Sequence, residues 1–290
     1  MDDRTINRRR FLQLSALAAA AGCVLRTSAQ AFADSGPMRY GVQLYMLRRQ
    51  ASTDLAGALK AIRQAGFTEV ELFPIAYSHP AAELKQMVAD AGLASPAAHF
   101  DYAGLEEKID YAHALGLKFM VCPMIPKSQW TSLAGFQQAA EVFNRVGEKS
   151  HAAGIEFCFH NHCYEFAPLE GSNGFTELMK HSDPKLVKLE FDMYWLAQAG
   201  QDPLAMMKQY ANRLRLVHLK DRIAGSSTGY DVFAPQHFTE LGKGYLPWPA
   251  ILELAKTQGI RHAFLDQDET KGPVAESLRE NFDYLKTVKV

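Results

Sequence analysis

Cysteine is scarce in this sequence, and no two cysteines have the C-x-x-C spacing. Four of the 290 residues are cysteine, and three of these lie beyond residue 33. An odd number of cysteines without paired spacings argues against a disulfide framework. No cysteines are placed to converge on a metal that prefers thiolate ligands.

The sequence also lacks an excess of charge and a long apolar run. Its formal net charge is −1, and the first 33 residues hold five Arg and two Asp, which leaves −4 on residues 34–290. This mild acidity argues against nucleic acid as a partner, because a surface that follows phosphates needs clustered Lys and Arg. The apolar run from Leu14 to Leu25 is too short and too rich in alanine for a good membrane span.

The first 33 residues have the pattern of a removable export signal. The run RRRFL at residues 8–12 precedes the apolar stretch, and AFA at residues 31–33 offers small residues for cleavage. This pattern resembles a twin-arginine signal, so we expect export to the periplasm and a mature domain at residues 34–290. A short amphipathic helix is the alternative for this segment. The run AAGC at residues 20–23 leaves open a lipid anchor at Cys23, although no large aliphatic residue stands at position 20.

From residue 39 onward, short apolar runs alternate with longer amphipathic ones. Asp54 and Gly66 mark the start and the end of one expected helix, as an N-cap residue and a C-terminal glycine do. We expect strands at residues 39–47, 68–73, 95–101, 118–123, 155–162, 186–192, 214–220 and 262–266. Helices are expected at residues 54–65, 80–91, 105–115, 133–153 and 274–286, with others that start near Gly174, Asp202 and Trp248.

Eight such units predict a parallel sheet covered by helices, and the expected architecture is a closed (β/α)₈ TIM barrel in a single domain. No linker rich in Pro, Gly or Ser divides the chain. A doubly wound open sheet is the main alternative. The barrel is favoured because polar residues recur at the ends of most strands and no Gly-rich fingerprint follows the first. The segment 224–244 is expected to be either a lid over the site or a mobile loop.

Four polar clusters end four of the later strands. Alternate residues of a strand share a face, and the carboxyl ends of barrel strands converge around one point. Imidazoles and carboxylates gathered in this way predict a site for a divalent cation. The clusters are Phe159-His160-Asn161-His162, Glu190-Phe191-Asp192, His218-Leu219-Lys220-Asp221 and Asp266-Gln267-Asp268.

These clusters, in this order, resemble the xylose-isomerase-like barrels, and most of all an exported branch of sugar phosphate isomerases/epimerases. The resemblance extends to YGVQLY at residues 40–45, VEL at 70–72, HNHCYEF at 160–166, EFDMYW at 190–195 and LGKG at 241–244. It covers nearly all of residues 34–290, and it is specific for the fold and the metal site rather than for the substrate. The family includes sugar isomerases and epimerases, inosose dehydratases and abasic-site endonucleases.

The resemblance implies one divalent ion held by Glu, Asp, His and Glu from strands five to eight. Asp192 and His218 match that pattern, whereas Asp266 stands where Glu is usual. On strand five, His160 stands where many members have Glu, so either His160 binds the ion or Glu165 reaches back from the loop. The expected ion is Mn²⁺, Co²⁺, Zn²⁺ or Mg²⁺. The expected ligands are His160, Asp192, His218 and Asp266, with Asp268 as the alternative to Asp266.

A divalent ion at this site indicates chemistry in which a proton is removed from the carbon beside a carbonyl group. With open positions it would chelate a ketone oxygen and the neighbouring hydroxyl, and stabilise the enediolate that forms. Glu165 or Asp266 would take the proton and return it. Lys220 would offset the developing negative charge, or form a structural ion pair with Glu190. Isomerisation or epimerisation of a carbohydrate is the first expected outcome, and elimination or hydration on a keto-sugar or keto-glycoside is the alternative.

Further side chains are expected to contact a small-molecule carbohydrate: His99, Glu71, His162, Trp195 and Tyr45. Each also has a structural interpretation, because a histidine can be capped, a glutamate paired and an aromatic ring buried in the core. A periplasmic sugar-binding protein without catalysis is the alternative outside enzymes. An abasic-site nuclease would need three clustered metals and a basic groove. The sequence does not indicate an oligomeric state.

Overall fold

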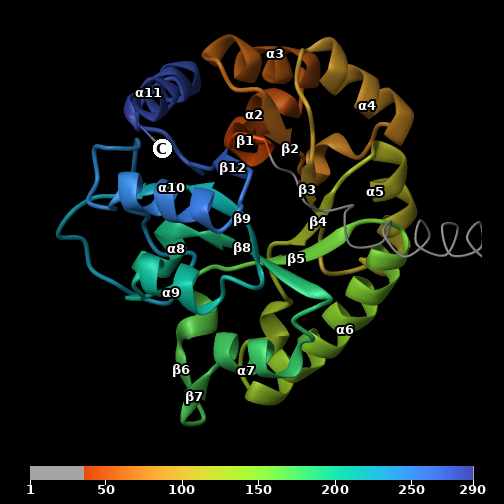
Figure 1. Ribbon diagram of the computed structural model, residues 1–290, viewed down its shortest axis with the longest axis vertical. Coiled ribbons are helices and arrows are strands. Elements are labelled where there is room, and N and C mark those ends of the chain that lie inside the picture. The colour runs from red at the N-terminus through yellow and green to blue at the C-terminus, as the bar shows by residue number, and fades with distance from the viewer. Residues whose placement is uncertain (1–35, 290) are drawn as a thin grey trace, which may run out of the picture. The chain divides into compact units, whose positions relative to one another are not determined.

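The computed structural model describes residues 36–289, and the eight expected strands are present in that range (Figure 1). They are β1 Arg39–Gln43, β2 Glu69–Glu71, β3 Ala97–His99, β4 Phe119–Cys122, β5 Glu156–His160, β8 Val187–Asp192, β9 Leu214–Leu219 and β12 His262–Leu265. Nearly all their residues are buried. This is the composition expected of parallel strands with helices outside and packed side chains inside.

The strands close into a barrel. Their order is β2-β1-β12-β9-β8-β5-β4-β3, and the pairs within it are parallel. The two ends of this order meet through parallel bridges from Glu69 to Ala94 and from Leu72 to Ala98. The His99 N–H donates to the Leu72 carbonyl oxygen at 2.9 Å across the same seam. The predicted (β/α)₈ architecture is therefore confirmed.

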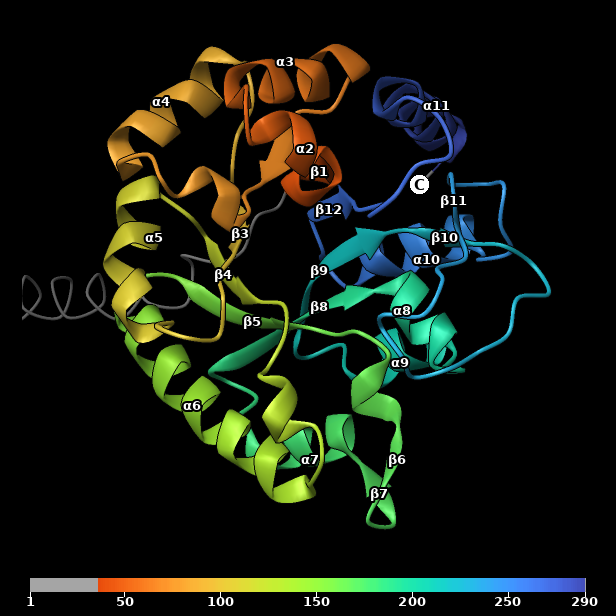
Figure 2. The ribbon, with the colours of Figure 1, turned by 180° about the vertical axis from the view of Figure 1, so that it is seen from behind.

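Helices surround the strands in the two opposite views (Figures 1 and 2). The expected helix caps are confirmed at Asp54, whose Oδ1 accepts the Gly57 N–H at 2.8 Å, and at Gly66, whose φ is 113°. The ring of Phe282 in the last helix packs 5.0 Å from that of Phe67, next to the first long helix. The helices are α2 Arg48–Ala51, α3 Leu55–Ala65, α4 Ala81–Asp90, α5 Ile109–Leu115, α6 Leu133–Ala152, α7 Gly174–His181, α8 Met193–Gln198, α9 Pro203–Gln209, α10 Trp248–Thr257 and α11 Val274–Thr287.

Two local features differ from the sequence expectation. The first strand ends at Gln43, because Leu44–Leu47 turns into a 3₁₀ helix. Helix α8 follows β8 without any loop, and the Asp192 side chain accepts the Trp195 N–H at 3.0 Å as its N-cap. Other 3₁₀ helices lie at Pro74–Ala76, Glu106–Lys108, Lys127–Gln129 and Tyr164–Phe166, and the strands β6 Pro168–Leu169 and β7 Ser172–Asn173 form a small hairpin.

The barrel interior is arranged in layers. One layer is apolar and consists of Ala97, Phe119, Val121, Cys158, Leu216 and Phe264. Gly41 belongs to this level, where a Cβ would lie 2.6 Å from the Phe264 ring, so the glycine makes room for that ring. Two residues beyond Ala97, Cys158, Leu216 and Phe264, the interior becomes polar, at His99, His160, His218 and Asp266. The alternation of side chains thus places the polar residues in one layer at the carboxyl ends of the strands.

The segment 224–244 is folded against the barrel rather than extended into solvent. It contains β11 Phe238–Thr239, which pairs antiparallel with β10 Asp221–Arg222. The Asp221 carboxylate accepts the N–H groups of Gly242 at 3.0 Å, Gly244 at 3.2 Å and Leu246 at 3.2 Å. This buried carboxylate therefore fixes the C-terminal end of the segment, where the chain comes back to the barrel. Val232, Phe233 and Phe238 of the segment line a pocket at the carboxyl end of the strands. Whether the segment acts as a lid or as a mobile loop remains a prediction.

Replacing Asp221 with alanine is expected to lower the free energy of unfolding by about 2–4 kcal/mol, because several backbone donors lose a charged acceptor. Asp231→Ala is the matched control, since Asp231 lies on the same segment and is exposed, and its side chain accepts the Phe233 N–H at 2.9 Å. The control is expected to lose about 1 kcal/mol or less. Urea unfolding of both variants checks this, and equal losses would contradict the anchoring role of Asp221.

The described helices include none with the length and apolarity needed to cross a bilayer. Cys122, Cys158 and Cys163 are buried and free, as expected from a sequence without a disulfide framework. The predicted signal at residues 1–33 and the possible lipid anchor at Cys23 lie outside the described residues.

Candidate metal centre

Three histidines surround one glutamate at the carboxyl end of the barrel. Glu190 Oε2, from β8, lies 2.8 Å from His99 Nε2, 3.2 Å from His160 Nδ1 and 3.2 Å from His218 Nε2. The side chains come from β3, β5, β8 and β9, and all four residues are buried. We call His99, His160, Glu190 and His218 the histidine cluster.

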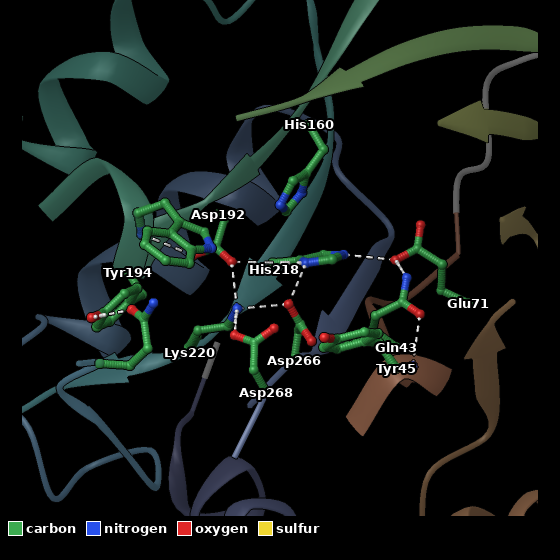
Figure 3. A network of polar contacts seen from close by, with 12 residues as sticks. Gln43, Tyr45, Glu71, His160, Asp192, Tyr194, His218, Lys220, Asp266 and Asp268 are labelled. Atoms are coloured by element: carbon green, nitrogen blue, oxygen red, sulfur yellow. Dashed lines mark hydrogen bonds and ion pairs between the residues drawn. The ribbon is translucent and has the colours of Figure 1, made fainter. Parts of the chain in front are cut away.

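A second glutamate borders the histidine cluster. Glu71 Oε2, at the end of β2, lies 2.7 Å from His218 Nε2 and 3.3 Å from His99 Nε2. The Gln43 side-chain amide donates to the same oxygen at 2.8 Å, and its own oxygen accepts the Tyr45 N–H at 3.1 Å. These two hydrogen bonds fix the orientation of the Gln43 amide, and with it the position of Glu71 (Figure 3).

A buried lysine binds three aspartates beside the histidine cluster. Lys220 Nζ lies 2.7 Å from Asp266 Oδ2, 2.9 Å from Asp268 Oδ2 and 3.2 Å from Asp192 Oδ2. We call Asp192, Lys220, Asp266 and Asp268 the lysine cluster. The alternative ion pair of Lys220 with Glu190 is wrong, because Glu190 points to the three imidazoles, and Lys220 contacts the aspartate at the end of β8 and the two aspartates that follow β12.

His218 joins the two clusters through its two ring nitrogens. Nε2 faces Glu71 and Glu190, whereas Nδ1 lies 3.3 Å from Asp266 Oδ2 and 3.9 Å from Asp192 Oδ2. Figure 3 shows the ring between Glu71 on one side and the two aspartates on the other. Among residues 36–289, His218 is therefore the residue shared by the two sets of acidic groups.

The side chains perturb one another's protonation. Burial, followed by the nearby charge of Glu190, raises the pKa of Glu71 to about 7, and burial raises the pKa of Asp192 to about 6. Burial lowers the pKa of His160 to about 3, which keeps that imidazole neutral. Burial opposes the charged form of His218 too, but Glu190 and Glu71 outweigh it and hold the pKa of His218 well above its usual range.

The two clusters together fit a bound cation. Five carboxylates lie close together here: those of Asp192, Asp266 and Asp268 contact the Lys220 ammonium group, whereas those of Glu71 and Glu190 face His218 Nε2. Buried carboxylates without a compensating cation are costly. Glu71 Oε1 and Glu190 Oε1 are buried without a hydrogen-bond partner among the described residues. Two sets of ligand atoms within 4.8 Å of one another are present in that range: the histidine cluster, and Asp192 with His218 and Asp266. This buried His/Glu/Asp group could bind a metal ion.

A pocket of about 400 Å³ opens above the two clusters. His99, His160, Asp266 and Asp268 contribute polar atoms to its lining. Aromatic rings form much of the remaining wall, and such rings pack against the apolar faces of sugar rings. These rings belong to Tyr45, Phe73, Trp195, Phe233 and Phe238. The size and lining suit a small polar molecule with apolar faces.

Two further expected site residues, His162 and Glu165, lie in different places. His162 lines the pocket, with its ring centroid 5.2 Å from that of Trp195. Glu165 does not reach the histidine cluster, because both of its oxygens accept the His162 N–H, at 3.0 and 3.1 Å. The structure thus places His160, and not Glu165, at the strand-five position of the site. The burial of Glu165 raises its pKa to about 8.

Two residues at the centre were not among the expected site residues. Glu190 belongs to a motif that the sequence singled out, and its alternation with Asp192 was the available signal that it faces the interior. Gln43 lies two residues after Gly41 on the same face of β1, so the same alternation could have found it. Both were overlooked because the expected ligand set came from the resemblance, which has no ligand at these positions.

The sequence matches the family model described as Xylose isomerase-like TIM barrel over residues 59–288. The protein belongs to this family. An inosose dehydratase from Clostridium beijerinckii is 26% identical over 125 residues, which are 39% of this chain and 41% of that protein. The match therefore spans about two fifths of this curated relative's length.

Solved structures of the family extend the likeness over the whole barrel. A sugar phosphate isomerase/epimerase from Parabacteroides distasonis is 25% identical with a TM-score of 0.70, and the match covers 87% of this chain and 97% of that one. The protein named IolI, solved with a zinc atom, has a TM-score of 0.67 over 87% of this chain and 98% of its own at 10% identity, which shows the fold alone. A sugar-like small molecule fits this family as substrate.

Proposed function

We propose that the protein is a metal-dependent enzyme that removes the proton beside the carbonyl of a keto-sugar or keto-polyol. The observation that carries the proposal is the excess of buried carboxylates, together with three imidazoles, on the floor of a pocket with aromatic walls. A carbon–hydrogen bond beside a carbonyl becomes acidic only when the oxygen is polarised, and a bound divalent ion supplies that polarisation.

The residues of the chain supply the base and the compensating charge. Asp266 lines the pocket, and its Oδ1 makes no hydrogen bond within the described residues, while Oδ2 contacts Lys220. Burial favours the neutral acid, but Lys220 and His218 outweigh it and hold the pKa of Asp266 below its usual range, so the carboxylate is charged and able to accept a proton. Lys220 then offsets the charge that builds up on the substrate.

Two fates of the deprotonated substrate are open, and each has support. Return of the proton to carbon makes the protein an isomerase or epimerase, in keeping with the solved structure from Parabacteroides distasonis. Loss of a neighbouring hydroxyl makes it a dehydratase, that is, a lyase, in keeping with the inosose dehydratase relatives. Both fates share the abstraction step, which is the substance of the proposal. The substrate would meet the enzyme in the periplasm if the expected twin-arginine signal is functional.

Deuterium exchange is the test of this step. Metal-loaded protein and candidate keto-sugars or keto-polyols are incubated in D₂O, and each carbon-bound proton is followed by NMR. We expect exchange at the carbon beside the carbonyl, slowed by at least about 100-fold in Asp266→Asn, because the base is lost. Asp283→Asn is the matched control, since that aspartate is exposed and pairs with Lys286.

The products separate the two fates. A rearranged isomer of the same mass indicates isomerisation or epimerisation, and an unsaturated product lacking one water indicates elimination. No exchange with any ketose, combined with sugar affinity that survives Asp192→Ala and His218→Ala, would contradict the proposal and favour a sugar-binding protein without catalysis.

A further inference from the structure

We propose that the divalent ion is held by the histidine cluster, through His99, His160, His218 and Glu190, and not between Asp192 and Asp266. The proposal rests on the metal dependence proposed above and names the ligands of that ion. It keeps His160 and His218 from the set expected from the sequence, and it replaces the two aspartates by residues of β3 and β8.

The spacing of the cluster suits one ion. A tetrahedral ion with ligands at about 2.1 Å separates neighbouring ligand atoms by about 3.4 Å. Glu190 Oε2 lies 2.8 to 3.2 Å from one ring nitrogen of each histidine, which is slightly less than this separation. A small outward movement of the four side chains therefore makes room for the ion at their centre.

The contacts of the three imidazoles with the carboxylates also favour a bound cation. A ring nitrogen that faces a carboxylate oxygen must carry a proton or bind a cation, because two lone pairs repel. The ring centroids lie 5.2 Å apart for His99 and His160, 5.4 Å for His99 and His218, and 4.5 Å for His160 and His218. Three imidazolium charges in so small a volume would repel one another strongly. One divalent ion satisfies all three nitrogens at once.

The position between Asp192 and Asp266 already holds a positive charge. Lys220 Nζ lies 3.2 Å from Asp192 Oδ2 and 2.7 Å from Asp266 Oδ2, and these are the oxygens that face His218 Nδ1. An ion at that place would have to displace the ammonium group. Asp266 Oδ2 instead lies 3.3 Å from His218 Nδ1, on the side of the ring opposite to Nε2, and Nε2 faces the histidine cluster. Carboxylate, imidazole and metal in this order are a common arrangement around protein-bound metals.

The ligand set narrows the choice of ion and leaves it accessible. Three imidazole nitrogens and one carboxylate favour Zn²⁺, Co²⁺ or Fe²⁺ over Mg²⁺, which prefers oxygen ligands. His99 and His160 also line the pocket. An ion between them can therefore accept an oxygen atom of a pocket ligand as an additional ligand.

Cobalt binding to single variants tests the proposal. Metal-free protein is titrated with Co²⁺, and the visible absorption of the bound ion reports both affinity and ligand environment. His160→Gln and His99→Gln are expected to lower the affinity by at least about 100-fold, because each removes a direct ligand. Asp192→Asn is expected to change it by less than about tenfold and to keep the wild-type spectrum. His162→Gln is the matched control. This imidazole lines the pocket but lies outside the histidine cluster, so its replacement should leave the Co²⁺ affinity unchanged.

The other outcomes contradict the proposal in distinguishable ways. A loss of at least about 100-fold in Asp192→Asn, whether or not the histidine variants also lose affinity, would place the ion between the aspartates and leave the proposed function intact. Absence of Co²⁺ and Zn²⁺ binding by the wild-type protein would remove the metal from the proposed function altogether. Circular dichroism of each variant establishes that the fold is kept.

Discussion

Replacement of His218 by glutamine is expected to remove the bound metal and to lower turnover by at least about 10³-fold. The reason is the position of the imidazole, whose Nε2 faces Glu71 and Glu190 while Nδ1 faces Asp266. Glutamine fills much of the same volume but cannot direct a nitrogen to both sides at once. The variant is checked by metal analysis of the purified protein and by the rate of deuterium exchange.

His113→Gln is the control for this prediction, because His113 is exposed on α5, away from the pocket lining. The control is expected to keep both metal and turnover. The account is wrong about His218 if the His218→Gln protein holds a full equivalent of metal and turns over within about threefold of the wild type.

Replacement of Lys220 by methionine is expected to lower the free energy of unfolding by about 3–5 kcal/mol at neutral pH. Lys220 is almost completely buried and contacts Asp192, Asp266 and Asp268. Methionine fills the space of the side chain but leaves these carboxylates without their common partner. Lys243→Met is the control, because Lys243 is exposed and pairs with Glu280 at 2.6 Å on the surface, where such a pair contributes about 1 kcal/mol or less.

The loss of unfolding free energy in Lys220→Met should depend on pH. Burial already raises the pKa of Asp192 to about 6, above its value in an unfolded chain, and removal of the ammonium group raises it further. A folded-state pKa above the unfolded one means that protonation favours the folded state. The part of the difference from wild type that comes from Asp192 should therefore shrink as the pH falls from the higher pKa of the variant towards about 6, and should change little below that. Urea unfolding at several pH values measures this, and a loss that stays below about 1 kcal/mol at neutral pH would contradict the role of Lys220.

The fold could be predicted from the sequence because its signals are local and repeated. Buried strand runs, an N-cap at Asp54 and a glycine stop at Gly66 each depend on neighbouring residues only. Helix α8 was not predicted because it is six residues long and follows the last strand residue directly, without a polar turn between strand and helix. The end of β1 was misplaced because a 3₁₀ turn of apolar residues, Leu44–Leu47, reads as more strand.

The site could be predicted only in part, because its contacts join distant strands. The alternation of side chains places His160, His218 and Asp266 in one layer, and the structure agrees. Which carboxylate meets which cation depends on how the strands are staggered around the barrel, where Asp192 pairs in register with His218. The sequence of a single strand does not determine this stagger. The partners of Lys220 and the central position of Glu190 therefore became visible only in the structure.

The central claim is that a divalent ion lies at the floor of the pocket, bound by His218. A crystal of the protein loaded with Co²⁺ or Zn²⁺, measured on both sides of the absorption edge of that metal, tests this most directly. The account predicts one strong anomalous peak at about 2.1 Å from a ring nitrogen of His218. A fully loaded crystal with no anomalous peak in contact with His218 would contradict it.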